Sequence, residues 1–96
     1  MSFTLFLWHE VSDDINHLPD KTRRIIQAAL KRLEEDPYPG KDGDKEKIVL
    51  KGGEVIYRLH ISRSFTAFYD IDKENKRILV QEVLPIGKAH KKYGYY

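Results

Sequence analysis

The chain has 96 residues, which is the size of one small domain and leaves no room for a second. Seventeen Lys and Arg residues stand against fifteen Asp and Glu residues, so the net charge is only +2 and binding of nucleic acid by bulk charge alone is excluded. No cysteine is present, which excludes a disulfide framework, a thiol nucleophile and thiolate metal sites. A composition of 41% hydrophobic and 33% charged residues predicts a soluble globular domain.

The first residues predict a β-strand. Residues 2–8 are rich in β-formers and carry apolar side chains on both faces, which predicts an interior or well-covered strand. The run is too short for a membrane span, which needs about 20 apolar residues, and it lacks the basic start of a signal peptide. Together with the lack of cysteine, these features predict a cytoplasmic protein that does not contact a membrane.

Two helices are expected next. The spacing of Val11, Ile15 and Leu18 predicts a short helix over residues 11–18. A second helix begins after Pro19 and ends before Pro37, because the residue before a proline is disfavoured in the α region. Its apolar stripe consists of Ile25, Ile26, Ala29, Leu30 and Leu33.

The second half of the chain predicts four short strands. They cover residues 48–50, 54–61, 65–71 and 77–86, and turns are expected at Gly52-Gly53, at residues 62–64 and at residues 72–76. The order is β-α-α-β-β-β-β. We therefore expect an α+β fold, in which two N-terminal helices pack on one face of a small, mostly antiparallel sheet.

Arg58 and His60 are the first candidates for chemistry. They lie two residues apart on a predicted strand and so share a face, which should point away from the helices. Imidazole exchanges protons near neutral pH, and a guanidinium can hold a phosphate with two hydrogen bonds. RNA cleavage by attack of a 2′-hydroxyl needs these groups. Two ordinary polar residues on a solvated strand face are the simpler interpretation of the spacing.

The tail, residues 86–96, is the second candidate. It contains Lys88, Lys91 and Lys92 and no acidic residue, so the rest of the chain is slightly negative and the excess positive charge lies in the tail. His90 lies between Lys88 and Lys91, and three tyrosines, Tyr93, Tyr95 and Tyr96, follow the lysines. Interleaved cations and aromatic rings suit single-stranded nucleic acid. A frayed, solvated terminus is the alternative. No motif with metal-ligand spacing is present, so neither a metal nor another cofactor is expected.

The chain resembles the RelE/ParE toxin superfamily over nearly its whole length, as a single domain of residues 1–96. The resemblance rests on the order of the elements and on four short motifs. These are Leu18-Pro19 before the long helix, Tyr57-Arg58-Leu59-His60-Ile61, Phe68-Tyr69-Asp70-Ile71, and Leu84-Pro85-Ile86-Gly87-Lys88.

The resemblance implies the toxin of a type II toxin–antitoxin module, neutralised by a cognate antitoxin that covers an apolar groove. In the RelE branch it implies metal-independent cleavage of mRNA on the ribosome. Arg58, His60 and Lys88 match basic positions of that branch, and Tyr95, or else Tyr93, falls near its tail tyrosine. His60 would then act as base or acid with His90 or Tyr95 as its complement, and Arg58, Arg63 and Lys88 would hold the scissile phosphate. Further RNA contacts would come from Lys91, Lys92 and Tyr93.

Two positions depart from the RelE pattern. Thr66 and Ala89 stand where RelE-like enzymes have arginine, and Arg63 and His90 are the nearest replacements for those charges. Two alternatives therefore stay open. One is a ParE-like toxin that inhibits DNA gyrase and cleaves no RNA, and the other is an inactive relative that only binds an antitoxin.

Overall fold

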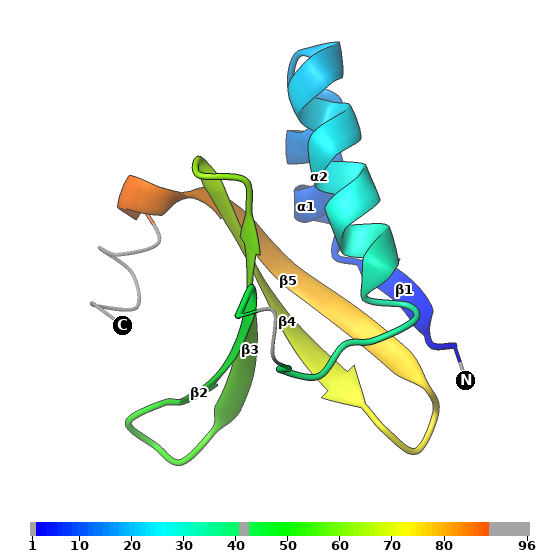
Figure 1. Ribbon diagram of the computed structural model, residues 1–96, viewed down its shortest axis with the longest axis vertical. Helices are drawn as coiled ribbons and strands as arrows, with labels where there is room; N and C mark the ends of the chain where they lie inside the picture. Colours follow the sequence, from blue (N-terminus) through cyan, green and yellow to red (C-terminus); the bar gives the residue numbers. More distant parts are fainter. Residues whose placement is uncertain (1, 41–42, 89–96) are drawn as a thin grey trace.

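The computed structural model describes residues 2–40 and 43–88. Its elements are β1 (Thr4–Leu7), α1 (His9–Asn16), α2 (Asp20–Arg32), β2 (Lys45–Val49), β3 (Val55–Ile61), β4 (Phe65–Asp72) and β5 (Arg77–Pro85). The strands form one sheet in the order β1-β5-β4-β3-β2, and both helices lie on the same side of it (Figure 1). The predicted α+β fold and element order are confirmed. No helix in the described ranges is long and apolar enough to cross a bilayer.

Strands β2 to β5 form an antiparallel meander, and β1 returns parallel to β5. All three predicted turns are present. Gly53 closes the first with a φ of 87°, which a residue without a Cβ adopts freely, and Ser62 opens the second with a φ of 53°. Because successive hairpins turn at opposite ends of a sheet, the turn at 62–64 lies far from the turn at 72–76.

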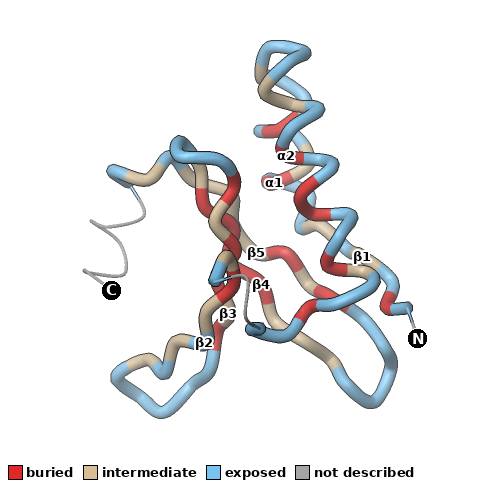
Figure 2. The backbone as a smooth tube through the Cα atoms, in the orientation of Figure 1, coloured by how far each residue is buried: buried red, intermediate tan, exposed pale blue. Residues whose placement is uncertain are grey.

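The main core fills the space between the helices and the sheet. Figure 2 shows the buried stretches along the inner side of α2 and along the central strands. In β3 the residues of this core, Leu59 and Ile61, alternate with Arg58 and His60, and Ala67 and Tyr69 of β4 belong to the same core. Period-two alternation therefore assigned the faces of β3 correctly.

A β-bulge shifts the register between β4 and β5. Phe68 pairs with Glu82, but the next residue of β4, Tyr69, pairs with Val80, so Gln81 is the extra residue. Without this insertion Glu82 would continue the alternation of Ile78 and Val80 toward the helices. The bulge instead turns Glu82 to the opposite face of the sheet.

The structure corrects two details. β1 is an edge strand and not an interior one, and Phe6 and Trp8 on its outer face are 46% and 52% exposed. An apolar pattern on both faces cannot distinguish a covered strand from an edge strand with exposed aromatic side chains. Helix α2 ends at Arg32, before the predicted proline stop, and Ile25 of its apolar stripe is exposed because it lies beside the buried stripe and not within it.

Candidate functional site

Three of the four predicted site residues that the structure describes, His60, Arg63 and Lys88, lie toward one end of the sheet, and the fourth, Arg58, lies at the middle of β3. His60 on β3 pairs with Thr66 on β4, which in turn pairs with Leu84 on β5. Beyond this row, the N–H of Ile86 donates a 3.0 Å hydrogen bond to the carbonyl oxygen of Ser64. This bond ties the segment after β5 to the β3–β4 turn, and Figure 1 shows the two side by side.

This end of the sheet carries two exposed cations. Arg63 lies in the β3–β4 turn, and Lys88 lies in the helical turn of residues 86–88 that follows β5. His60 presents a side chain that is 35% exposed on the adjoining face. The register therefore gathers an imidazole, a guanidinium and an ammonium group from three segments.

Arg58 lies on the predicted face of β3 but is not open to solvent. Its side chain is only 3% exposed, and its Nη2 donates a 2.6 Å hydrogen bond to Oε2 of Glu46 on the neighbouring strand β2. Arg58 thus lies on the face away from the helices, as predicted, but its guanidinium is not freely accessible. It forms an ion pair with the carboxylate of Glu46.

Glu46 is the residue that sequence reasoning missed. Its Oε1 lies 3.4 Å from Nε2 of His60, so one carboxylate contacts both members of the predicted cationic pair. A signal for it existed in the sequence. Glu46 and Arg58 lie equally far from Gly52, so a hairpin centred on that glycine places them opposite each other.

The surroundings of Glu46 favour its charged form. Partial burial alone would raise its pKa, but the hydrogen bonds and positive charges of Arg58 and His60 together lower the pKa below its usual value. Glu46 is therefore ionised throughout the neutral range, and it compensates the charge of Arg58.

The rest of this face is largely closed. Thr66 is buried, and its Oγ1 donates a 3.2 Å hydrogen bond to the carbonyl oxygen of Leu59. A second apolar cluster covers the middle of the face; it consists of Ile56 and Phe68 with Ile48, Leu50 and Leu84 around them. Position 66, where the RelE pattern has an arginine, thus has a structural role in this chain.

Five predicted site residues lie outside the described residues: His90, Lys91, Lys92, Tyr93 and Tyr95. Their roles stay predictions, as does that of Ala89 as a departure from the RelE pattern. Lys88 is the last described residue, and it leads directly into them. Within the described residues, no group of three His, Cys, Asp or Glu side chains is arranged to hold a metal ion.

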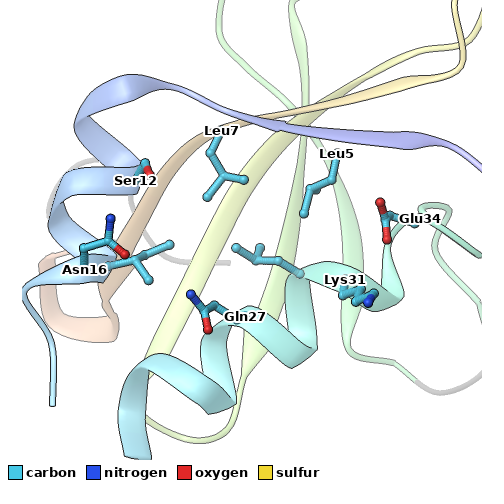
Figure 3. Close-up of a pocket in the computed structure, with 9 residues that line it drawn as sticks. Leu5, Leu7, Ser12, Asn16, Gln27, Lys31 and Glu34 are labelled. Carbon is cyan, nitrogen blue, oxygen red and sulfur yellow. The ribbon is translucent and has the colours of Figure 1, made fainter. Parts of the chain in front are cut away.

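A groove lies on the other side of the molecule, between β1 and the two helices (Figure 3). Its volume is about 380 Å³. Leu5 and Leu7 from β1 point into it, and Gln27 and Lys31 from α2 line the opposite wall. Ile15 and Leu30 complete its apolar part.

No protein-family model and no curated protein sequence matches the chain. Solved structures do match it. A chain of the archaeal RelE–RelB complex from Pyrococcus horikoshii OT3 superimposes with a TM-score of 0.74 at 22% identity, covering 92% of this chain and 99% of that one. The Mycobacterium tuberculosis toxin–antitoxin complex RelBE2 gives 0.68 at 14% identity, with coverages of 86% and 96%.

The isolated Escherichia coli RelE toxin matches with a TM-score of 0.58 at 17% identity, covering 95% of this chain and 98% of that one. At such identities the likeness is one of fold. It extends over nearly the whole of both chains, so no large element is missing or added relative to that toxin.

Proposed function

We propose that this chain, which has the fold of the RelE toxins, is the toxin of a toxin–antitoxin module and cleaves mRNA on the ribosome. The observation that carries the proposal is the gathering of His60, Arg63 and Lys88 at one end of the sheet, directly before the basic tail. Fold likeness alone does not assign an activity, so the proposal depends on this site.

The reaction would proceed without a metal. A base takes the proton of the ribose 2′-hydroxyl, and the oxygen attacks the adjacent phosphorus. The bond to the 5′-oxygen then breaks, and an acid protonates the leaving oxygen. The products are a 2′,3′-cyclic phosphate and a 5′-hydroxyl. His60 is the candidate base or acid, with His90 or Tyr95 as its complement, and Arg63 and Lys88 stabilise the charge that develops on the phosphate.

The partners in this proposal are a cognate antitoxin, the ribosome and mRNA, all in the cytoplasm. Support for the antitoxin comes from the structural matches, several of which are toxin–antitoxin complexes. The groove between β1 and the helices is a candidate surface for this partner, because Leu5, Leu7, Ile15 and Leu30 line it together with polar residues. The tail residues Lys91, Lys92 and Tyr93 would supply further contacts to RNA.

Primer extension on an mRNA in a translating extract tests the proposal. The wild-type chain should produce new 5′ ends within the reading frame, and His60→Ala should reduce them strongly. His17→Ala is the matched control, because His17 is an exposed histidine on the helical side of the fold, where Nδ1 contacts the carbonyl oxygen of Asp13. Equal cleavage by wild type and a folded His60→Ala variant would remove His60 from the site.

One observation favours a second candidate function, that of a gyrase inhibitor. Arg58 is paired with Glu46 and Thr66 is buried, so two positions expected to face RNA are occupied by structural contacts. A DNA supercoiling assay separates the two functions. Inhibition of gyrase without cleavage of mRNA would decide for the ParE-like activity.

A further inference from the structure

Glu46, Arg58 and His60 form a chain of contacts across the β2–β3 hairpin. Arg58 Nη2 lies 2.6 Å from Oε2 of Glu46, and Oε1 of the same carboxylate lies 3.4 Å from Nε2 of His60. The Arg58 side chain is 3% exposed, whereas those of Glu46 and His60 are 40% and 35% exposed. A buried guanidinium thus holds a half-exposed carboxylate, which contacts a half-exposed imidazole.

The backbone of β2 is fixed around this chain of contacts. Glu46 pairs with Arg58 in the strand register, and the N–H of His60 donates a 2.8 Å hydrogen bond to the carbonyl oxygen of Asp44. On the opposite face of β2, the buried ammonium of Lys45 lies 3.8 Å from a carboxylate oxygen of Asp36. The carboxylate of Glu46 is therefore held through its backbone and through Arg58.

The contact also distinguishes the two nitrogens of the imidazole. An ionised carboxylate can only accept, so a neutral His60 bonded to Glu46 must carry its proton on Nε2. Nδ1 is then the nitrogen with a free lone pair. The charged groups beside His60 are Glu46 on β2, Arg58 on β3 and Asp44, which directly precedes β2. The residues of the same row on β4 and β5, Thr66 and Leu84, are uncharged.

We propose that Glu46 is a positioning residue, which holds the ring of His60 so that Nδ1 faces the RNA, and that Arg58 acts by anchoring Glu46 and not by binding the phosphate. This inference rests on the proposed nuclease function. It reassigns Arg58 from a phosphate ligand to a support, and it leaves Arg63 and Lys88 as the described cations that can meet the phosphate.

Nuclear magnetic resonance tests the positioning separately from the activity. Three-bond couplings to Cγ of His60 report whether the ring occupies one χ1 rotamer. A single rotamer is expected in the wild type and in Glu46→Gln, whose amide oxygen still accepts a hydrogen bond from Nε2. Averaged rotamers are expected in Glu46→Ala. His17 provides an internal control in the same spectra, because its contacts lie on α1.

Cleavage assays give the second readout. Glu46→Ala should lower kcat about 100-fold with little change in KM, since a misplaced catalytic group slows the chemical step, and Glu46→Gln should recover part of this loss. If Glu46→Ala does not fold, Glu46→Leu with Arg58→Leu removes the carboxylate without leaving a buried charge unpaired. That double variant should also average the rotamers of His60.

The two proposals fail in different ways. A single His60 rotamer in folded chains without the Glu46 carboxylate would overturn the positioning role. If Arg58→Met raised KM and left the His60 rotamer unchanged, the result would support Arg58 as a phosphate ligand and contradict its role as an anchor for Glu46. A third outcome is that the wild-type chain cleaves no mRNA while Glu46→Ala still averages the His60 rotamers. That result would refute the nuclease function and leave the role of Glu46 in positioning His60 intact.

Discussion

The N–H of Ile86 donates a 3.0 Å hydrogen bond to the carbonyl oxygen of Ser64. This bond fixes the segment that carries Lys88 against the turn that carries Arg63, although 25 positions of sequence separate the two cations. Two flexible side chains on joined segments can contact neighbouring phosphates of one strand. In the proposed function, RNA would therefore bind at this end of the sheet.

Loss of Arg63 or Lys88 should weaken RNA binding in a salt-dependent way. Each cation that contacts a phosphate releases a counterion, so Arg63→Ala and Lys88→Ala should each reduce the slope of log affinity against log salt by about 0.7. Fluorescence anisotropy with a 2′-O-methyl RNA, which cannot be cleaved, measures the slope. Lys73→Ala is the control, because Lys73 is equally exposed but lies in the turn at the far end of the sheet. An equal loss of slope in all three variants would mean that RNA binds by overall charge.

The hydroxyl group of Tyr69 should stabilise the fold independently of the candidate functional site. Its hydroxyl donates a 2.6 Å hydrogen bond to the carbonyl oxygen of buried Pro37, and burial raises its pKa above the ordinary value. Tyr69→Phe keeps the ring, which stacks on Tyr57, but leaves the Pro37 carbonyl without this donor. We expect a loss of about 1–3 kcal/mol in the free energy of unfolding, measured by urea denaturation. Tyr57→Phe is the control, and a Tyr69→Phe variant as stable as wild type would show that this hydrogen bond contributes nothing.

The lowered pKa of Asp72 should make the stability of the fold depend on pH. Hydrogen bonds from Asn75 and Arg77 hold its pKa at about 2, below the ordinary aspartate value of 3.8. Because the folded-state pKa is the lower one, the stabilisation is complete above about pH 4 and is lost as the pH falls toward 2. Asp72→Asn should therefore unfold at a lower temperature than wild type at pH 6, and the two curves should converge near pH 2. Glu74→Gln, in the same turn, is the control. A gap that persists unchanged at pH 2 would contradict the carboxylate as its source.

Much of the fold could be predicted from local pattern. Alternation in β3 assigns Leu59 to the helix side and Arg58 to the other, because a strand has a side-chain period of two. The edge position of β1 could not be predicted in this way. Its neighbour β5 lies some 70 residues away in sequence, and the apolar pattern of Phe6 and Leu7 is the same whether or not a strand covers them.

The candidate site shows the same division. His60 can be proposed as a site residue from the sequence, because its chemistry and the face it occupies on β3 are local properties. The partner of Arg58 was missed, because Glu46 meets it only across the β2–β3 pairing. The burial of Arg58 also depends on the apolar cluster around Phe68, which gathers side chains from four strands and their turns. A cationic side chain on a strand can thus bind a substrate or stabilise a neighbouring side chain. The cross-strand partner, which the local sequence pattern does not show, determines which of the two roles is possible.

Deletion of residues 88–96 should abolish toxicity and leave the domain folded. The last strand ends at Pro85, and the last fully buried core residue in the described chain is Val80, so the deletion removes no part of the sheet or of that core. It does remove Lys88, Lys91 and Lys92, which carry the excess positive charge, together with the predicted catalytic candidates His90 and Tyr95. Growth of cells expressing the chain measures toxicity, and circular dichroism with thermal unfolding verifies the fold. A full-length chain with the exposed residues Lys47, Lys51 and Lys73 changed to alanine loses the same number of lysine charges and should stay toxic. If the truncated chain stopped growth as the wild type does, the tail would have no part in the activity, and His60, Arg63 and their neighbours would have to act without it.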